Sequence, residues 1–304
     1  MRRTFYLTFS ALLLAITTLS GTSCKSTAKA TTEAKAAAPD TLVTAPPFTY
    51  TTSQDSTISC SFEVDYPHQS DSLATGVKQF IAKELAHIYT PYNNEEDAAK
   101  NYPLFRGDVQ NCNDLVKHYA EGTKRYFIAQ QKEIMEEGTE DGWRPNFSCN
   151  VRIKKAAETA SYVTYSTAAE VYLGGAHGTY TWWETNISKH TNRPLAQTVD
   201  TTKVMAMQTI LRNGVISYLK DVGEENAEAD YKSILFLPED GHIPLPVCTP
   251  SLTKDGVSFV YQQYEIASYA VGLVSFTVPY SDIMPYLCNE AKALVNEVNS
   301  TKKE

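Results

Sequence analysis

The stretch at residues 162–188, YVTYSTAAEVYLGGAHGTYTWWETNIS, decides how this chain folds. Its two ends, residues 162–173 and 179–188, are rich in the β-branched and aromatic residues that favour extended strands. Between them, residues 174–178 (GGAHG) contain three glycines, which permit positive φ angles and close backbone approach. The pattern therefore predicts two antiparallel strands joined by a tight turn.

The predicted hairpin brings a histidine, two carboxylates and several aromatic rings together. The candidate binding residues are Glu170, Tyr172, His177, Tyr180, Trp182, Trp183 and Glu184. A hairpin symmetric about His177 places Glu170 opposite Glu184 and Tyr172 opposite Trp182. We interpret this arrangement as an aromatic-lined groove with His177 at its mouth, suited to a glycan or an extended peptide.

Alternation along the second strand places Tyr180 and Trp182 on one face and Trp183 on the other. A simpler interpretation of the same residues is also open. In that interpretation the turn is structural, the histidine caps backbone groups, and the aromatic rings fill the core.

Nothing in the sequence names a reaction. The six histidines form neither an H-x-x-x-H nor an H-E-x-x-H pair, and G-x-S-x-G, P-loop and G-x-G-x-x-G motifs are absent. We therefore assign no catalytic residue, no metal site and no cofactor. An alternative hypothesis is a hydrolase or esterase acting on peptidoglycan, in which His177 works with Glu170 or Glu184. A third is a purely structural envelope lipoprotein.

Composition sets the broad class. The chain has 304 residues, 42% of them hydrophobic and 20% charged, which is typical of a globular protein with a sizeable core. Its net charge of -8 argues against nucleic-acid binding, because phosphate backbones attract cationic surfaces.

The N-terminus indicates export. Residues 1–23 combine Arg2 and Arg3 with an apolar run at 5–19 and the small residues SGTS, as in a secretory signal. Cys24 follows directly, which predicts a lipidated first residue of the mature chain. Leu19 lies further from Cys24 than in a strict lipobox, and looser lipoboxes of this kind resemble those of the Bacteroidetes. A plain secretory signal is the alternative.

The rest of the chain divides into further segments by composition. Residues 24–47 are rich in Ala, Thr, Lys and Pro and predict a flexible linker. Residues 48–155 predict a small α+β domain, residues 156–298 a second one, and residues 299–304 a frayed tail. The boundary at 155 is soft, because the two parts can share one sheet.

Hydrophobic periodicity predicts an α+β fold, with mixed or antiparallel sheets packed against about four helices. The expected strands are 57–66, 147–155, 162–173, 179–188, 257–266 and 273–279. The expected helices begin at Asp71 or Ser72, at residue 111, at Asp200 or Thr201, and at Ser281.

The cysteines and tyrosines give weaker indications of structure and function than the segments above. With Cys24 acylated, the remaining cysteines are Cys60, Cys112, Cys149, Cys248 and Cys288. Their irregular spacing favours buried thiols, with Cys248–Cys288 as the one candidate disulfide. Nineteen tyrosines crowd partly into residues 261–286, either as core composition or as an aromatic recognition surface.

Two segments carry a family resemblance. The first is GGAHG at 174–178 with the strand at 180–187 and the turn at 191–199. The second is YEIASYAVG at 264–272, running into FTVPYS at 276–281 and Tyr286-Leu287. Together they resemble the domain-of-unknown-function family 3298, also called RsiV-like. The preceding region resembles the PdaC-like N-terminal domain found beside deacetylases (domain-of-unknown-function family 4163).

The resemblance covers about residues 57–287 and implies an α/β fold that faces the cell envelope. Members include the extracellular part of an anti-sigma factor that binds lysozyme, accessory regions of peptidoglycan deacetylases and many lipoproteins. The deacetylase active site lies in a separate domain, so no catalytic residue carries over. We expect a lipid-anchored binding module that faces the periplasm, most simply from the outer membrane. Its expected partners are the membrane, through the lipid, and a peptidoglycan fragment or a lysozyme-like protein.

The anchor yields the first prediction. Mass spectrometry of the native N-terminus should show a mature chain that begins at Cys24 and carries fatty acyl groups. Each buried acyl CH₂ contributes about 0.8 kcal/mol of membrane affinity, so several chains make the attachment effectively permanent. A mature chain without lipid at Cys24 would contradict the assignment.

Overall fold

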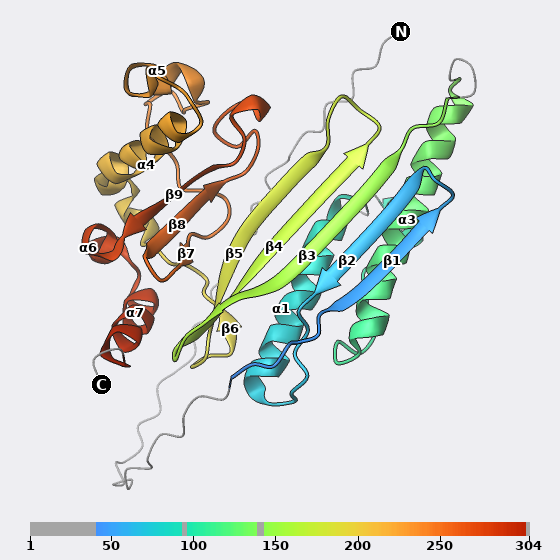
Figure 1. Ribbon diagram of the computed structural model, residues 1–304, viewed down its shortest axis with the longest axis horizontal. Coiled ribbons are helices and arrows are strands. Elements are labelled where there is room, and N and C mark those ends of the chain that lie inside the picture. The colour runs from blue at the N-terminus through green and yellow to red at the C-terminus, as the bar shows by residue number, and fades with distance from the viewer. Residues whose placement is uncertain (1–40, 93–95, 139–142, 302–304) are drawn as a thin grey trace, which may run out of the picture. The chain divides into compact units, whose positions relative to one another are not determined.

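The computed structural model describes residues 41–92, 96–138 and 143–301, and Figure 1 shows their helices and strands. They form a six-stranded sheet of order β1-β2-β3-β4-β5-β6 and a three-stranded sheet of order β7-β8-β9. Seven α-helices accompany the two sheets in this part of the chain, which confirms the predicted α+β class. The signal segment, Cys24 and most of the predicted linker lie outside the described residues.

The large sheet is mixed. Its strands are β1 (Phe48–Gln54), β2 (Ile58–Val64), β3 (Phe147–Glu158), β4 (Tyr162–Leu173), β5 (Thr179–Ser188) and β6 (Arg193–Pro194). Only β2 and β3 run parallel to each other, and all other neighbours are antiparallel. A parallel pair needs a long crossover, which the helical segment between these two strands supplies.

Two helices of that crossover cover one face of the large sheet (Figure 1). The crossover holds α1 (Ser72–Tyr89), the 3₁₀ turn Thr90–Tyr92, α2 (Glu96–Asn101) and α3 (Cys112–Glu136). Asp71 caps α1 by accepting a hydrogen bond from the Ala74 N–H at 2.8 Å, as one of the two predicted caps. Alternate residues of β2, from Ile58 to Val64, are buried beneath these helices, as their spacing predicts.

The predicted linker ends earlier than expected. Leu42 is only 2% exposed, and its backbone N–H donates to the Glu158 carboxylate. Lys155 donates to the Leu42 carbonyl oxygen at 2.6 Å. The segment at 41–47 is therefore attached to the sheet, because the Leu42 side chain is buried in the core of the large sheet. Strand β1 follows directly, and its Thr- and Ser-rich sequence did not predict a strand.

The second body surrounds the small sheet. Its elements are the 3₁₀ helix Thr201–Met207, α4 (Gln208–Asp221), α5 (Ala227–Ile234), β7 (Ser251–Leu252), β8 (Gly256–Tyr261), the 3₁₀ turn Tyr269–Val271, β9 (Val274–Pro279), α6 (Tyr280–Ile283), the 3₁₀ turn Met284–Tyr286 and α7 (Asn289–Thr301). Helix α4 lies on β9, where a Cβ at Gly214 would come within 2.2 Å of the Phe276 ring. Gly214 thus permits the close approach of helix and sheet.

The single helix predicted from Ser281 is wrong. The structure has α6, a 3₁₀ turn and then α7, with Leu287 in extended conformation between them. Leu287 forms a β-bridge with Val199, and the Cys288 N–H donates to the Thr198 carbonyl oxygen at 3.0 Å. This long-range pairing draws the backbone out of the helix just after Pro285.

The predicted domain boundary at residue 155 falls inside β3. A register shift between Lys155 and Ala157 marks a β-bulge at this point. The strands on both sides of the boundary belong to one sheet, so the division into two domains there stays a prediction.

The predicted Cys248–Cys288 disulfide is not formed, and both cysteines are free thiols. Cys248 accepts a weak hydrogen bond from Gln262 Nε2 at 3.7 Å, whereas Cys288 donates to the Gln197 carbonyl oxygen at 2.9 Å. Cys248 lies in the connection between α5 and β7, and Cys288 lies directly before α7. Cys60 and Cys149 are fully buried, as the pattern predicted.

No helix among the described residues combines the length and apolarity that a membrane span requires.

Asn186 joins the two sheets. It is 3% exposed and lies on β5. Its Oδ1 accepts from the Leu252 N–H at 2.6 Å, and its Nδ2 donates to the Leu252 carbonyl oxygen at 2.9 Å and to Thr164 Oγ1 at 2.9 Å. The side chain thus pairs with β7 as a neighbouring strand would.

Replacing Asn186 by Ala should lower the free energy of unfolding by about 2–4 kcal/mol, since buried backbone groups of Leu252 lose their partners. Urea denaturation with an unchanged m-value would measure the loss. Asn150→Ala is the matched control, because Asn150 is half-buried on β3 and its side chain has no hydrogen-bond partner among the described residues. Its effect should stay within about 0.5 kcal/mol. Equal effects of the two substitutions would contradict the role of Asn186.

Candidate functional site

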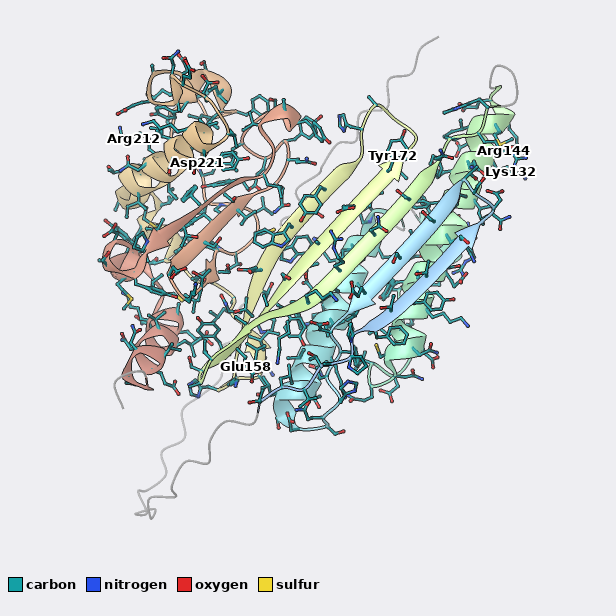
Figure 2. All side chains as sticks on the ribbon, viewed as in Figure 1. Lys132, Arg144, Glu158, Tyr172, Arg212 and Asp221 are labelled. Carbon is teal, nitrogen blue, oxygen red and sulfur yellow. The ribbon has the colours of Figure 1, made fainter. Side chains whose placement is uncertain are left out.

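The β4–β5 hairpin has a different register from the predicted one. Glu170 pairs with Tyr180 and Ala168 pairs with Trp182, so the hairpin is centred on Gly175 instead of His177. Gly174 adopts a φ of +73°, and the Tyr172 hydroxyl closes the turn by donating to the Gly175 carbonyl oxygen at 3.0 Å. Figure 2 labels Tyr172 at the turn end of β4. The predicted pairs Glu170–Glu184 and Tyr172–Trp182 are therefore wrong.

Glu184 instead pairs with Ser166 of β4. The observed pairing of β5 with β4 is shifted by four residues from the predicted pairing, since Glu170 lies opposite Tyr180 instead of Glu184. A shift by an even number of residues leaves every side chain on its predicted face of the sheet. Trp183 points towards α1, where its Nε1 donates to Glu84 at 2.8 Å and its ring meets His87 edge-on. Trp182, one residue away, faces the opposite side of the sheet, as predicted. Trp183 therefore belongs to the packed face and is separated from Tyr180 and Trp182.

His177 lies in a small aromatic cluster. Its ring stacks on Tyr269 with centroids 3.8 Å apart and an interplanar angle of 19°. Its Nε2 lies 3.4 Å from the Tyr264 hydroxyl, and its Nδ1 lies 3.0 Å from the Gly178 carbonyl oxygen. The hairpin turn thus meets a segment of the chain almost ninety residues later.

Tyr264 is the most unusual member of this cluster. It is 54% exposed, and its backbone adopts a φ of +66°, a region that non-glycine residues seldom occupy. Such strain persists only where the surroundings hold it, and it concentrates at functional positions. The sequence placed Tyr264 and Tyr269 in a tyrosine-rich region but did not connect either residue with His177.

Two glutamines hold the cluster beside β5. Gln262 Oε1 accepts from the Trp182 N–H at 3.1 Å, and Gln262 Nε2 donates to the Trp182 carbonyl oxygen at 2.9 Å. Gln263 Oε1 accepts from the Tyr180 N–H at 3.1 Å. The backbone of the strand that carries Tyr180 and Trp182 is therefore fixed to the segment that carries Tyr264 and Tyr269.

We call His177, Tyr180, Trp182, Tyr264 and Tyr269 the aromatic surface. His177 and Tyr264 are exposed, and the other three are half-buried. Two cavities of the structure lie elsewhere, and the predicted aromatic-lined groove with His177 at its mouth stays a prediction.

The carboxylates of the predicted site serve other partners. Glu170 forms an ion pair with Arg152 at 2.8 Å, with both side chains about half exposed. Glu184 accepts from Ser251 Oγ at 3.1 Å, and burial raises the pKa of Glu184 above its usual range. Among the described residues, no carboxylate lies within hydrogen-bond distance of His177. The histidine–carboxylate pair that the hydrolase hypothesis requires is not assembled.

Two cavities of about 240 Å³ each occur elsewhere. One lies between α4, α5 and the turn at 238–243, and the other lies beside Phe48 and Tyr66. Neither contains a residue of the predicted site. Within the described ranges, no three His, Cys, Asp or Glu side chains converge in a way that could hold a metal ion.

Comparison with known proteins places part of the chain in a class. Residues 212–281 match the family model described as a protein of unknown function (DUF3298). This segment runs from within α4 into α6 and contains Tyr264 and Tyr269. No curated protein matches the chain.

Two solved structures are similar. A DUF3298 family member from Bacteroides fragilis NCTC 9343 aligns with a TM-score of 0.55 and 18% identity, covering 86% of this chain and all of the other. A DUF3298 family protein from Pseudomonas aeruginosa PAO1 aligns with a TM-score of 0.49 and 14% identity, covering 84% of this chain and 98% of the other. At this identity, the first likeness establishes a shared fold.

Glu84 on α1 accepts hydrogen bonds from Trp183 and Thr167 of the large sheet, and its protonation should affect the stability of the fold. Burial raises the pKa of Glu84, although hydrogen bonds from Thr167 and Trp183 oppose the shift. The folded chain therefore binds this proton more tightly than the unfolded chain. The stability that Glu84 contributes is present below its unfolded pKa and is lost as pH rises through its folded pKa.

Replacing Glu84 by Gln removes this titration while an amide oxygen remains to accept both hydrogen bonds. At pH 7 the variant should be more stable than the parent by on the order of 1 kcal/mol, and the gain should vanish near pH 4. Urea denaturation across this pH range measures it. Glu170→Gln, which removes an exposed ion pair, should show no such gain, and a pH-independent difference for Glu84→Gln would refute the argument.

Proposed function

We propose that this chain is a lipid-anchored binding module of the cell envelope that recognises its ligand without catalysis. In this proposal, residues 1–23 direct export, Cys24 carries the lipid, and the body that begins near residue 41 faces the periplasm from the outer membrane. The sequence pattern before Cys24 supports the anchor. The separation of His177 from carboxylates supports a role in binding.

The aromatic surface is the observation that carries the proposal. Two segments distant in sequence supply its rings, and side-chain amides of Gln262 and Gln263 hold them in place. Fixed rings that are at least partly exposed lose little conformational entropy when a ligand binds. Such rings bind large, weakly polar faces, and tyrosine and histidine add hydrogen-bonding groups at the ring edges.

A cell-wall glycan fits this chemistry. The C–H faces of sugar rings offer flat apolar area, and their hydroxyls can bond Tyr264, His177 and the nearby Arg152–Glu170 pair. A wall-active protein, such as a lysozyme, is the second ligand class that an exposed aromatic surface could bind. The RsiV-like resemblance of the second half and the PdaC-like resemblance of residues 48–155 are part of the same proposal, and the DUF3298 match supports the first of them.

The soluble body for binding experiments should begin at Thr41, because Leu42 is buried. Calorimetric titration with muropeptides should give saturable binding, and titration with c-type lysozyme tests the protein alternative. Binding of lysozyme alone would replace the glycan with a protein ligand. If the body binds neither muropeptides nor lysozyme, the proposed binding function is wrong.

Two variants connect the binding to the surface. Trp182→Ala should weaken it by about 1–3 kcal/mol, the range of an aromatic anchor. Tyr264→Ala should act similarly and Tyr264→Phe much less if the ring face makes the contact. Circular dichroism should show that all variants remain folded. Phe236→Ala is a matched control for an exposed aromatic ring outside the surface, and an equal loss in that variant would contradict the assignment.

A further inference from the structure

The cavity between α4, α5 and the turn at 238–243 has a chemistry that the proposed function does not use. Its volume is about 240 Å³, and Arg212, Lys232, Asp240 and His242 contribute to its lining. Arg212, labelled in Figure 2, lies on α4, and Lys232 lies on the neighbouring α5. The cavity therefore collects three basic side chains and one carboxylate from three separate segments.

The wall of this cavity is held rigidly. Gln208 Oε1 accepts from the Ile243 N–H at 2.8 Å, and Gln208 Nε2 donates to the Ile243 carbonyl oxygen at 2.9 Å. The preceding turn closes through a hydrogen bond from the Gly241 N–H to the Pro238 carbonyl oxygen at 2.8 Å, with Gly241 at a φ of +73°. Such preorganisation lowers the entropic cost of binding a ligand.

The charges in the cavity are unbalanced. Asp240 is the only carboxylate in the lining, and it already accepts from His242, whose Nδ1 lies 2.5 Å from its Oδ1. Hydrogen bonds from His242 hold the pKa of Asp240 below its usual range. The side chains of Arg212 and Lys232 have no ion-pair or hydrogen-bond partner among the described residues. In a chain of net charge -8, two cationic side chains that no described residue pairs with line one cavity.

We infer that this cavity binds a small oxyanion, either a phosphate group or a dicarboxylate. The planar guanidinium of Arg212 can donate two parallel hydrogen bonds to such a group, and Lys232 supplies a second positive charge. The volume is smaller than the roughly 300–1,000 Å³ of sites for larger organic ligands, which favours a compact ion. The inference is independent of the aromatic surface and of its ligand.

Isothermal titration of the full-length chain tests the inference, with inorganic phosphate and succinate as separate probes at matched ionic strength set with sodium chloride. We expect saturable binding of at least one probe at a single site. Arg212→Gln and Lys232→Gln should each weaken it by about tenfold, as the loss of a charge-assisted contact implies. Both side chains are exposed, so neither substitution disturbs the core.

Lys220→Gln is the matched control. Lys220 is also an exposed cation on α4, but it forms an ion pair with Glu228 and does not line the cavity. It should leave the affinity unchanged. Saturation by phosphate alone identifies a phosphoryl ligand, and saturation by succinate alone identifies a dicarboxylate. Saturation by neither probe, or equal weakening in all three variants, overturns the inference.

Discussion

Strand β6 pairs with β5 only at Ile187 and Ser188, so backbone N–H and C=O groups earlier along β5 must find other partners, and side-chain amides supply several of them. Gln262 pairs with both backbone groups of Trp182, Gln263 accepts from the Tyr180 N–H, and Asn186 pairs with both backbone groups of Leu252. These bonds join the large sheet to the second body. They occupy backbone groups of β5 that no neighbouring strand pairs with in the described sheet.

The aromatic surface depends on the hydrogen bonds from Gln262 and Gln263 to β5. The hairpin turn alone would present His177 on a glycine-rich loop with no partner. Because Gln262 and Gln263 hold the following segment against β5, Tyr269 stacks on the imidazole and Tyr264 lies beside it. Tyr264, with its positive φ, directly follows these two glutamines. A recognition surface therefore arises from groups that individually look like ordinary surface tyrosines and a turn histidine.

The same pairing device recurs within the second body, where Gln208 binds both backbone groups of Ile243 and fixes the wall of the cationic cavity. Most of the cavity lining, with Arg212 and Lys232, and Tyr264 and Tyr269 of the aromatic surface lie within the segment that matches DUF3298. The large sheet contributes the hairpin and the packed face behind it, where Glu84 anchors Trp183. The two parts of the chain thus have different roles: the large sheet presents the hairpin, and the second body supplies its partners.

The sequence by itself determined the strands at 162–173 and 179–188, a start of α1 at Asp71 or Ser72, and the faces of Trp182 and Trp183. Alternation and capping are local, and they survive a change of register. The tertiary structure alone decided the hairpin register, the docking of Leu42, the break before α7 and the meeting of His177 with Tyr264. Each of these depends on a contact between residues far apart in the chain. Local propensity does not encode such contacts, because their energy comes from partners that only the folded chain brings within reach.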